Sequence, residues 1–424
     1  MKFKNLLAQS LVWRSVYYIS LLFLNIAISR HLQAAGSGDL FYLTNFFYFF
    51  QLLLSLTIEN ALTYFGASGK IDIPSLFWFS LLWCGLISIL LYALSFTGWV
   101  FYQKYFVYAF AYIAGLSLVN FISAFFYMQR NFYLPSILSS LLNLVLFFAI
   151  ILSGKALDVY IGSLFFWLFF ANGILLMIAY AFYNKDVFSI RLPSFGNIQK
   201  MLRFSALTLT ANIVFFLVYR IDYLFVKYSA VCSSADLGNY IQASKLGQML
   251  LLVPQVLASV IFPQTASGAD RAMVNNTLTI ISRLFSQGFL LLLLLLLVAG
   301  KWFLPFVFGN TFNKMYWAFV LLLPGIFSLS VLALLSAYFS GKGKVKVNIT
   351  GAFISLVIVT TGDYFLIPLY GINAAAAVST IAYSAGMFYS LYCFYKDYSI
   401  SFSGFFKWRR TDYQWLIEAI NKKR

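Results

Sequence analysis

Three basic residues stand inside long apolar segments, where a charge is costly. Arg14, Arg220 and Lys245 each fall within a stretch long enough to cross a membrane. A charge at the centre of a membrane helix costs about 2.5–3.5 kcal/mol on insertion scales, so it normally faces a cavity or a partner. Guanidinium and ammonium groups attract compact anions such as phosphates. These residues therefore predict a cationic cavity that binds an anionic substrate.

The depth of each basic residue follows from the helical rise of 1.5 Å per residue. Arg14 lies about 13 Å into the first segment, which places it near mid-membrane. Lys245 lies roughly 12 Å from the outer end of its segment, and Arg220 about 24 Å from the inner end of its own. The alternative, that each pairs with a carboxylate or with carbonyl groups at a helix end, stays open on sequence alone.

Three carboxylates, Glu59, Asp222 and Asp363, occupy the same kind of segment. A carboxylate exposed to each side of the membrane in turn can bind a proton or a sodium ion and couple it to transport. Glu59 lies close to the inner end of its segment, where a solvated or capping role is equally expected. Arg220 and Asp222 are two residues apart, about 200° around a helix, so they cannot both face one cavity. Apart from a coupling proton or sodium ion bound by such a carboxylate, we expect no cofactor.

The composition decides which elements position these residues. Hydrophobic residues make up 62% of the 424 and charged residues 10%, whereas soluble domains carry about 25% charged residues. Segments of about 20 apolar residues cross the bilayer as helices, because an open sheet edge would leave backbone polar groups unsatisfied in lipid. The sequence predicts an all-α integral membrane protein with about twelve transmembrane helices in two pseudo-symmetric six-helix lobes.

The expected segments fall into two sets, joined by a polar, basic connection over residues 183–203. Pro254 and Pro324 lie inside expected segments and predict kinks. We expect an N-terminal lobe over 1–190, a C-terminal lobe over 191–397 and a basic cytoplasmic tail over 398–424. The first set covers 6–29, 40–66, 75–96, 105–128, 134–153 and 159–182, and the second covers 204–226, 237–262, 277–299, 315–340, 347–366 and 371–395.

The distribution of Lys and Arg predicts the orientation. Of 29 such residues, 19 belong to the N-terminal end, the even-numbered loops and the tail, six belong to the odd-numbered loops and the others lie inside the expected segments. Cytoplasmic loops carry the excess of positive charge, so both termini are expected in the cytoplasm. The net charge of +17 thus reflects topology and attraction to the anionic inner leaflet, and binding of nucleic acid is not expected.

Cysteine and histidine are too few to build a metal or catalytic site. Cys84, Cys232 and Cys393 are far apart and form no CxxC motif, and His31 is the single histidine. Zinc sites and disulfide frameworks need clustered ligands. We therefore predict neither a metal site nor catalytic residues.

Short matches between the two halves indicate an internal repeat. The second segment opens at Gly-Asp-Leu-Phe-Tyr, residues 38–42, and the eighth opens with Asp-Leu-Gly-Asn-Tyr, residues 236–240. The fourth ends in Ser-Ala-Phe-Phe at 123–126, and the tenth in Ser-Ala-Tyr-Phe at 336–339. Six helices return the chain to its starting side, so the halves would be parallel repeats with a substrate path between them.

A series of motifs in the second half carries a family resemblance. Together they resemble the Wzx-type O-antigen and polysaccharide flippases of the multidrug/oligosaccharidyl-lipid/polysaccharide (MOP) exporter superfamily. The match is rich from about Arg203 onward and weaker before it, so Arg14 rests on depth and charge alone. Many relatives have Gly-Ala-Ala where this chain has Asn373 followed by four alanines, a change conservative in size. The motifs are Arg220 with Asp222, then 237–240, 243–245, 260–263, 308–309, 323–325, 341–344 and 367–376.

The resemblance implies a function and partners. Members of this family move an undecaprenyl-pyrophosphate-linked oligosaccharide from the cytoplasmic to the periplasmic leaflet of the bacterial inner membrane by alternating access, for O-antigen and lipopolysaccharide biosynthesis. The implied partners are this lipid, the bilayer, a polysaccharide polymerase and a chain-length regulator. No bond is made or broken, so the protein would not be an enzyme. The diphosphate would interact with Arg14, Lys245 and Arg220.

Two other interpretations remain open. A multidrug or cation antiporter of the same superfamily would keep the helices but use an acidic or aromatic cavity for cationic drugs, which the basic membrane residues disfavour. An integral membrane enzyme that processes glycans, such as an O-antigen polymerase, would be expected to carry a large periplasmic loop or a histidine cluster. The odd-numbered loops expected here are all short.

Overall fold

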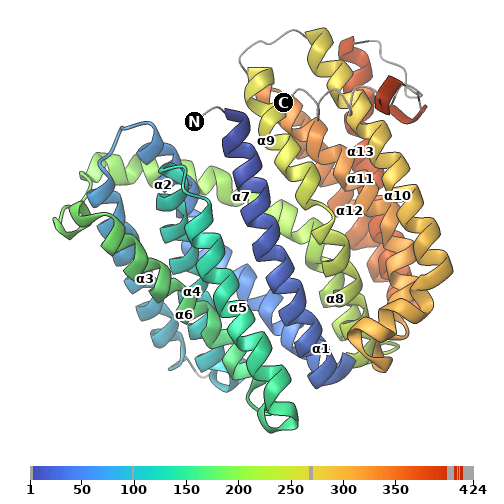
Figure 1. The fold of residues 1–424 in the computed structure, drawn as a ribbon, viewed down its shortest axis with the longest axis horizontal. Coiled ribbons are helices and arrows are strands. Elements are labelled where there is room, and N and C mark those ends of the chain that lie inside the picture. The colour runs from blue at the N-terminus through green and yellow to red at the C-terminus, as the bar shows by residue number, and fades with distance from the viewer. Residues whose placement is uncertain are drawn as a thin grey trace. The chain divides into compact units, whose positions relative to one another are not determined.

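The computed structural model describes residues 3–97, 100–266, 271–398, 405–407, 409 and 411–413. Within these residues every regular element is a helix (Figure 1). Of the helices in the described ranges, ten are long and apolar enough to cross a membrane. The all-α integral membrane class predicted from composition is thus confirmed.

The chain divides by its internal contacts into two compact units, 1–216 and 217–424. This division falls inside α7, whereas the lobe boundary expected from the sequence, at 190/191, lies before that helix. The expected lobe boundaries stay predictions. The helices of the first unit are α1 (Phe3–Ser55), α2 (Ile58–Ala67), α3 (Ile73–Leu94), α4 (Val100–Met128), α5 (Tyr133–Ser153), α6 (Ile161–Tyr183) and the first part of α7 (Phe195–Tyr228). Those of the second are the rest of α7, α8 (Ser234–Met249), α9 (Leu252–Ala266), α10 (Arg271–Phe308), α11 (Met315–Gly341), α12 (Val345–Tyr370) and α13 (Ile372–Tyr398).

Two features account for the difference between the ten candidate spans and the twelve expected segments. One candidate, Leu11–Ser55, has 45 residues and would be about 68 Å long if straight, enough for two crossings. It contains a kink at Gln33, whose φ is 59°, between the first and second expected segments. The eighth expected segment is divided between α8 and α9, of 16 and 15 residues, which are each too short to qualify alone.

A left-handed break separates α1 from α2. Leu56 and Thr57 have φ values of 49° and 52°, a conformation that side chains with a Cβ rarely adopt. The break is held by neighbours: the Trp83 indole donates to the Leu54 carbonyl at 3.0 Å, and the Thr57 hydroxyl lies 2.8 Å from the Thr208 hydroxyl of α7. Its consequence is that Glu59 stands in the first turn of a short new helix.

A proline accounts for the break between α8 and α9. Pro254 lies in the first turn of α9, and the two residues before that helix form a turn. Proline lacks an N–H and clashes with the carbonyl four residues earlier, so the helix that precedes it ends. The predicted interruption at Pro254 is confirmed, whereas Pro324 lies inside an unbroken α11.

Each unit is built around one strongly buried helix, α4 in the first and α11 in the second. In the first unit α4 packs most extensively against α6, and in the second α11 packs most extensively against α13. Glycines allow these close approaches: a Cβ on Gly115 would lie 2.4 Å from the Phe170 backbone nitrogen, and one on Gly325 would lie 2.8 Å from the Thr380 Cα. The pairs are the fourth with the sixth and the tenth with the twelfth expected segments, as the predicted repeat requires.

Part of the C-terminal tail packs into the second unit. Phe405 is 2% exposed, and its ring lies 5.5 Å from that of Phe394 in α13. The Asp412 carboxylate accepts two hydrogen bonds from the Arg283 guanidinium of α10, at 2.7 and 2.8 Å, and both side chains are almost fully buried. Phe405 and Asp412 of the expected tail are therefore part of the packed interior of this unit.

Candidate functional site

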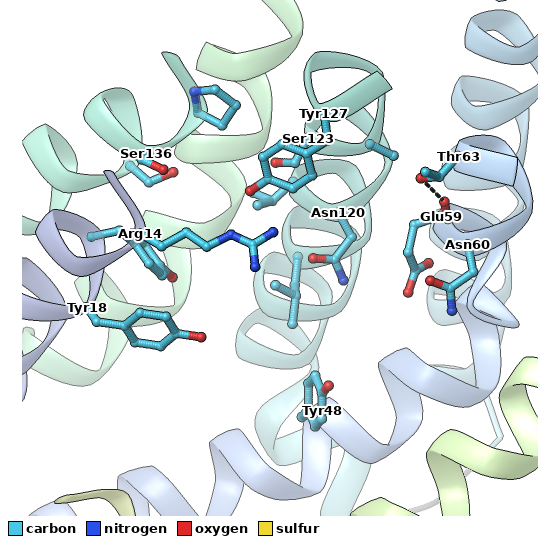
Figure 2. A pocket seen from close by; sticks show the side chains of 16 residues that line it. Arg14, Tyr18, Tyr48, Glu59, Asn60, Thr63, Asn120, Ser123, Tyr127 and Ser136 are labelled. Carbon is cyan, nitrogen blue, oxygen red and sulfur yellow. Dashed lines mark hydrogen bonds between the residues drawn. The ribbon is translucent and has the colours of Figure 1, made fainter. Parts of the chain in front are cut away.

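A polar pocket of about 470 Å³ lies among α1, α2, α4 and α5 in the first unit. Its most conspicuous members are Arg14 and Glu59, which point into the pocket from opposite sides with Asn120 between them (Figure 2). The other polar lining residues include Tyr17, Tyr18, Tyr48, Asn60, Thr63, Ser123, Tyr127, Ser136 and Ser139.

The Arg14 guanidinium is available for a ligand. Its carbon lies 5.6 Å from the centroid of the Tyr127 ring, and it makes no hydrogen bond or ion pair with any other described residue. A guanidinium has five N–H donors, which are matched best by a carboxylate or phosphate. Of the two interpretations left open for Arg14, the structure of this unit favours a residue facing a cavity over one paired inside the protein.

Glu59 gives the pocket a second charge of opposite sign. One carboxylate oxygen, Oε2, is buried without a hydrogen-bond partner among the described residues. The Thr63 hydroxyl donates to the backbone carbonyl of Glu59 at 2.8 Å, which leaves the carboxylate itself free to face the pocket (Figure 2). The pocket thus combines a fixed cation with a group that can take up a proton or a cation.

Sequence reasoning missed the uncharged polar residues of this pocket, although a signal was present. Asn120, Ser123 and Tyr127 of α4 are spaced by three and four residues and line the pocket together. That spacing places side chains on one face of a helix. A polar stripe on an otherwise apolar helix marks a face turned toward a cavity or another polar surface.

The second unit brings Arg220 and Lys245 together. The Arg220 guanidinium donates to Tyr223 and, at 2.5 Å, to Oε1 of Gln248, and Lys245 lies close enough for the two positive charges to repel. Neither hydrogen-bond partner of Arg220 neutralises its charge. The Asp222 carboxylate also lies close enough to attract Arg220 and offsets part of this positive charge.

The Asp222 carboxylate of α7 is held by three donors. Its carboxylate accepts hydrogen bonds from the Tyr240 hydroxyl, from the Tyr223 backbone N–H at 2.8 Å and from the Ser379 hydroxyl at 3.3 Å. Tyr223 contacts both Arg220 and Asp222, and the expectation that these two side chains cannot both face one cavity stays a prediction.

Asp363 of α12 approaches Asp222 in the second unit. The two carboxylates lie close enough for their charges to repel. Asp363 is fully buried, and neither of its oxygens has a hydrogen-bond partner among the described residues. A buried carboxylate without partners is costly unless it binds a proton or a cation.

The predicted site residues therefore form two groups. Arg14 and Glu59 share a pocket in the first unit, and the other four belong to the second unit. The idea that both groups face one common cavity stays a prediction. No group of three His, Cys, Asp or Glu side chains able to hold a metal ion occurs within the described ranges.

The comparisons with known proteins rest on structure. No protein-family model matches the sequence, and no curated protein sequence matches it either. Among solved structures, the inward closed conformation of the lipid II flippase MurJ is similar, with a TM-score of 0.68 and 14% identity over 90% of this chain and 87% of that one. A mutant of the MATE transporter VcmN of Vibrio cholerae is similar with a TM-score of 0.65 and 16% identity over 95% and 98% of the two chains.

A third similar structure has a different kind of binding pocket. It is a MOP superfamily transporter from Pyrococcus furiosus, described as having a binding pocket of reverse polarity that suggests a different function. The TM-score is 0.58, with 17% identity over 92% of this chain and 94% of that one. The chain therefore has the fold that the flippase MurJ and the MATE transporters of the MOP superfamily share.

Proposed function

We propose that this protein is a flippase for an undecaprenyl-pyrophosphate-linked oligosaccharide of the O-antigen or a related surface polysaccharide. It would move this lipid from the cytoplasmic to the periplasmic leaflet of the bacterial inner membrane by alternating access. The sugar would cross through the polar interior while the polyprenyl tail stays in lipid. A polysaccharide polymerase and a chain-length regulator would then act on the exported unit.

One observation carries the proposal: Arg14 faces a polar pocket and has no charged partner among the described residues. Glu59 lies across the pocket (Figure 2) and forms no ion pair with Arg14, so the guanidinium keeps its donors for a compact anion in this low-dielectric region. A diphosphate matches this need, because several of its oxygens can accept hydrogen bonds from the guanidinium and from the hydroxyls around it. The Arg220 and Lys245 pair offers a second region of the same sign.

The same observation disfavours a multidrug antiporter. In this pocket a cationic drug would approach a guanidinium that forms no ion pair with any described residue. MATE transporters share the fold, but a common fold can host sites of different chemistry. Growth of a deletion strain in cationic drugs measures this alternative, and increased drug sensitivity with normal surface glycan would favour it.

The decisive experiment replaces the pocket cation. Arg14→Ala and Lys245→Ala should each reduce surface polysaccharide about tenfold to a hundredfold, since a hydrogen bond to a charged group contributes about 1.5–3 kcal/mol. Arg14→Lys should retain part of the export because the charge remains. The measurement is surface glycan per membrane-inserted protein in a deletion strain that carries each variant.

Lys155→Ala is the matched control, because Lys155 is exposed in the short element after α5. It should leave export unchanged. Surface polysaccharide at the wild-type level in both Arg14→Ala and Lys245→Ala would refute the cationic site.

We further propose that the Asp222 and Asp363 pair binds the coupling proton or sodium ion. This proposal is supported by the burial of Asp363 and by its two carboxylate oxygens, which have no hydrogen-bond partner among the described residues. In proteoliposomes, an imposed sodium or proton gradient should accelerate movement of the labelled lipid, and the two gradients applied separately identify the ion.

Asp363→Asn should remove that gradient dependence. Asp397→Asn is the control, because Asp397 pairs with Lys344 at the surface. If gradients do not affect the wild-type protein while the lipid still moves, the coupling proposal fails and the flippase proposal stands.

A further inference from the structure

A second hollow of about 780 Å³ lies in the first unit, between α2 and the first part of α7. Its volume falls within the range of about 300–1,000 Å³ that is usual for ligand sites. We call it the α2–α7 groove and define it by its lining: Asn60, Thr63, Tyr64, Ala67, Ser68, Phe204, Thr208, Ala211 and Asn212.

The lining of this groove differs in chemistry from that of the Arg14 pocket. It contains no ionisable acid or base apart from the Tyr64 phenol, and combines amides and hydroxyls with aromatic and methyl groups. The amides of Asn60 and Asn212 make no hydrogen bond to any other described residue. An amide left against hydrocarbon is costly, so these two groups call for a polar, uncharged ligand or water.

The groove and the pocket adjoin each other along α2. Asn60 and Thr63 line both hollows. These residues follow Glu59 in the helix that the break at Leu56 and Thr57 creates. A molecule whose anionic end reaches Arg14 can therefore extend its neighbouring part past Asn60 into the groove.

The walls of the groove are fixed by contacts between its two helices. The hydroxyls of Thr57 and Thr208 lie 2.8 Å apart. The rings of Tyr64 and Phe204 stack, with centroids 5.0 Å apart and planes 11° from parallel. A groove whose walls are held in this way is preformed, which lowers the entropic cost of binding.

We propose that the α2–α7 groove holds the uncharged sugars next to the diphosphate, while the Arg14 pocket holds the diphosphate itself. The inference rests on the proposed function and adds the site of the glycan. Sugar hydroxyls need amide and hydroxyl partners, and the C–H faces of a sugar ring pack on aromatic and methyl groups, so both kinds of lining are used. A polyprenyl tail would leave Asn60 and Asn212 unsatisfied.

The test measures which part of the lipid covers which residue. In a protein whose cysteines Cys84, Cys232 and Cys393 are replaced by serine, Asn212→Cys reports on the groove and Asn120→Cys on the pocket. Both variants are first shown to export glycan. Their rates of modification by a polar maleimide are then measured in nanodiscs, with undecaprenyl diphosphate or with the lipid-linked oligosaccharide extracted from a polymerase-deficient strain.

We expect Cys introduced at Asn120 to be protected at least fivefold by either lipid, and Cys at Asn212 to be protected only by the sugar-bearing lipid. Ser189→Cys, at an exposed position in the loop before α7, is the control and should react equally in all samples. As a second measurement, Asn212→Ala should weaken binding of the sugar-bearing lipid about tenfold and leave binding of undecaprenyl diphosphate unchanged.

The other outcomes separate this inference from the proposed function. If the sugar-bearing lipid protects position 120 but not position 212, the groove is not the glycan site and the flippase proposal stands. If undecaprenyl diphosphate, which carries no sugar, already protects position 212, the groove holds the polyprenyl tail and the inference is overturned. If neither lipid protects position 120, the diphosphate site itself is wrong.

Discussion

Two arginines inside apolar helices have different surroundings in this molecule. Arg14 faces a pocket without a charged partner among the described residues, whereas Arg283 is paired with Asp412 through two short hydrogen bonds. A charge removed from water needs either a polar cavity or a counter-ion. The depth of an arginine in a helix therefore does not say by itself whether its role is functional or structural.

At the scale of single residues, we predict that Asp412→Ala strongly destabilises the second unit. The substitution leaves the Arg283 guanidinium buried without its counter-ion, which costs about 3–5 kcal/mol. The measurement is thermal or denaturant unfolding of the purified protein in detergent. Asp397→Ala is the control, because it breaks the exposed pair with Lys344 and should cost at most about 1 kcal/mol.

A double variant tests the cause of that effect. Arg283→Met with Asp412→Leu removes both charges and should recover most of the lost stability, because apolar replacements of a buried pair are often neutral. If Asp412→Ala alone unfolds like the wild type, the tail is not held by this ion pair.

At the scale of elements, the helix interruptions decide where the functional side chains point. The break at Pro254 follows from a residue type that cannot continue a helix. The break at Leu56 and Thr57 has no such local signal, because neither residue favours a left-handed backbone. It depends on contacts from α3 and α7, and so could not be predicted from the sequence of α1 and α2.

The contact between α4 and α6 gives a prediction at the same scale. Gly115→Ala should destabilise the first unit by about 1–3 kcal/mol, because the added methyl group would collide with the backbone of Phe170 and force the helices apart. Gly85→Ala is the matched control. Nothing lies within 4 Å of its added Cβ, and alanine favours a helix by about 1 kcal/mol over glycine. Equal melting temperatures for the two variants would contradict the close packing.

The start of α8 gives a prediction with a pH dependence. Ser233 and Asp236 cap each other's backbone N–H groups, and Lys314 donates to Asp236 at 2.6 Å. Burial raises the pKa of Asp236, but the hydrogen bonds from Lys314 and Ser233 outweigh this and hold the pKa below its ordinary value. A carboxyl whose pKa is lower in the folded state stabilises the protein above its unfolded pKa of about 3.9 and loses this effect as the pH falls.

We therefore expect Asp236→Asn to destabilise the protein at neutral pH. The difference in stability between this variant and the wild type should shrink as the pH drops below about 4. Ser233→Ala should cost about 1 kcal/mol through the lost cap. Melting temperatures of both variants across this pH range measure the effects. A constant difference between Asp236→Asn and the wild type would show that the charge of Asp236 is not involved.

At the scale of the whole molecule, the two units repeat one packing scheme. The most buried helix of each unit is the fourth of six expected segments, and it packs mainly against the sixth. The short matches at 123–126 and 336–339 lie near the ends of these two helices, α4 and α11. A repeat at the level of packing thus accompanies the weak repeat in sequence.

The orientation of the chain in the membrane gives a prediction at the scale of the whole molecule. If both termini are cytoplasmic, alkaline phosphatase fused after Arg424 should be inactive and green fluorescent protein at the same position should be fluorescent. A phosphatase fusion after Lys155, in an odd-numbered loop, should be active. The physical reason is the excess of Lys and Arg in the even-numbered loops and at both ends. The reverse pattern would contradict the topology.

The sequence by itself determined the all-α membrane class of the protein and pointed to charged residues inside its apolar segments. These properties follow from composition and from the length of apolar segments, which act locally along the chain. Arg14, Glu59 and the four charged residues of the second unit were all identified in this way.

Only the tertiary structure decided which of these residues lie together and what surrounds them. It placed Glu59 opposite Arg14 through a backbone break, supplied Asn120, Ser123 and Tyr127 from one face of α4, and paired Arg283 with a residue 129 positions later. Such pairings depend on how helices distant in sequence pack, and a local pattern carries no information about the neighbour that a helix face will meet.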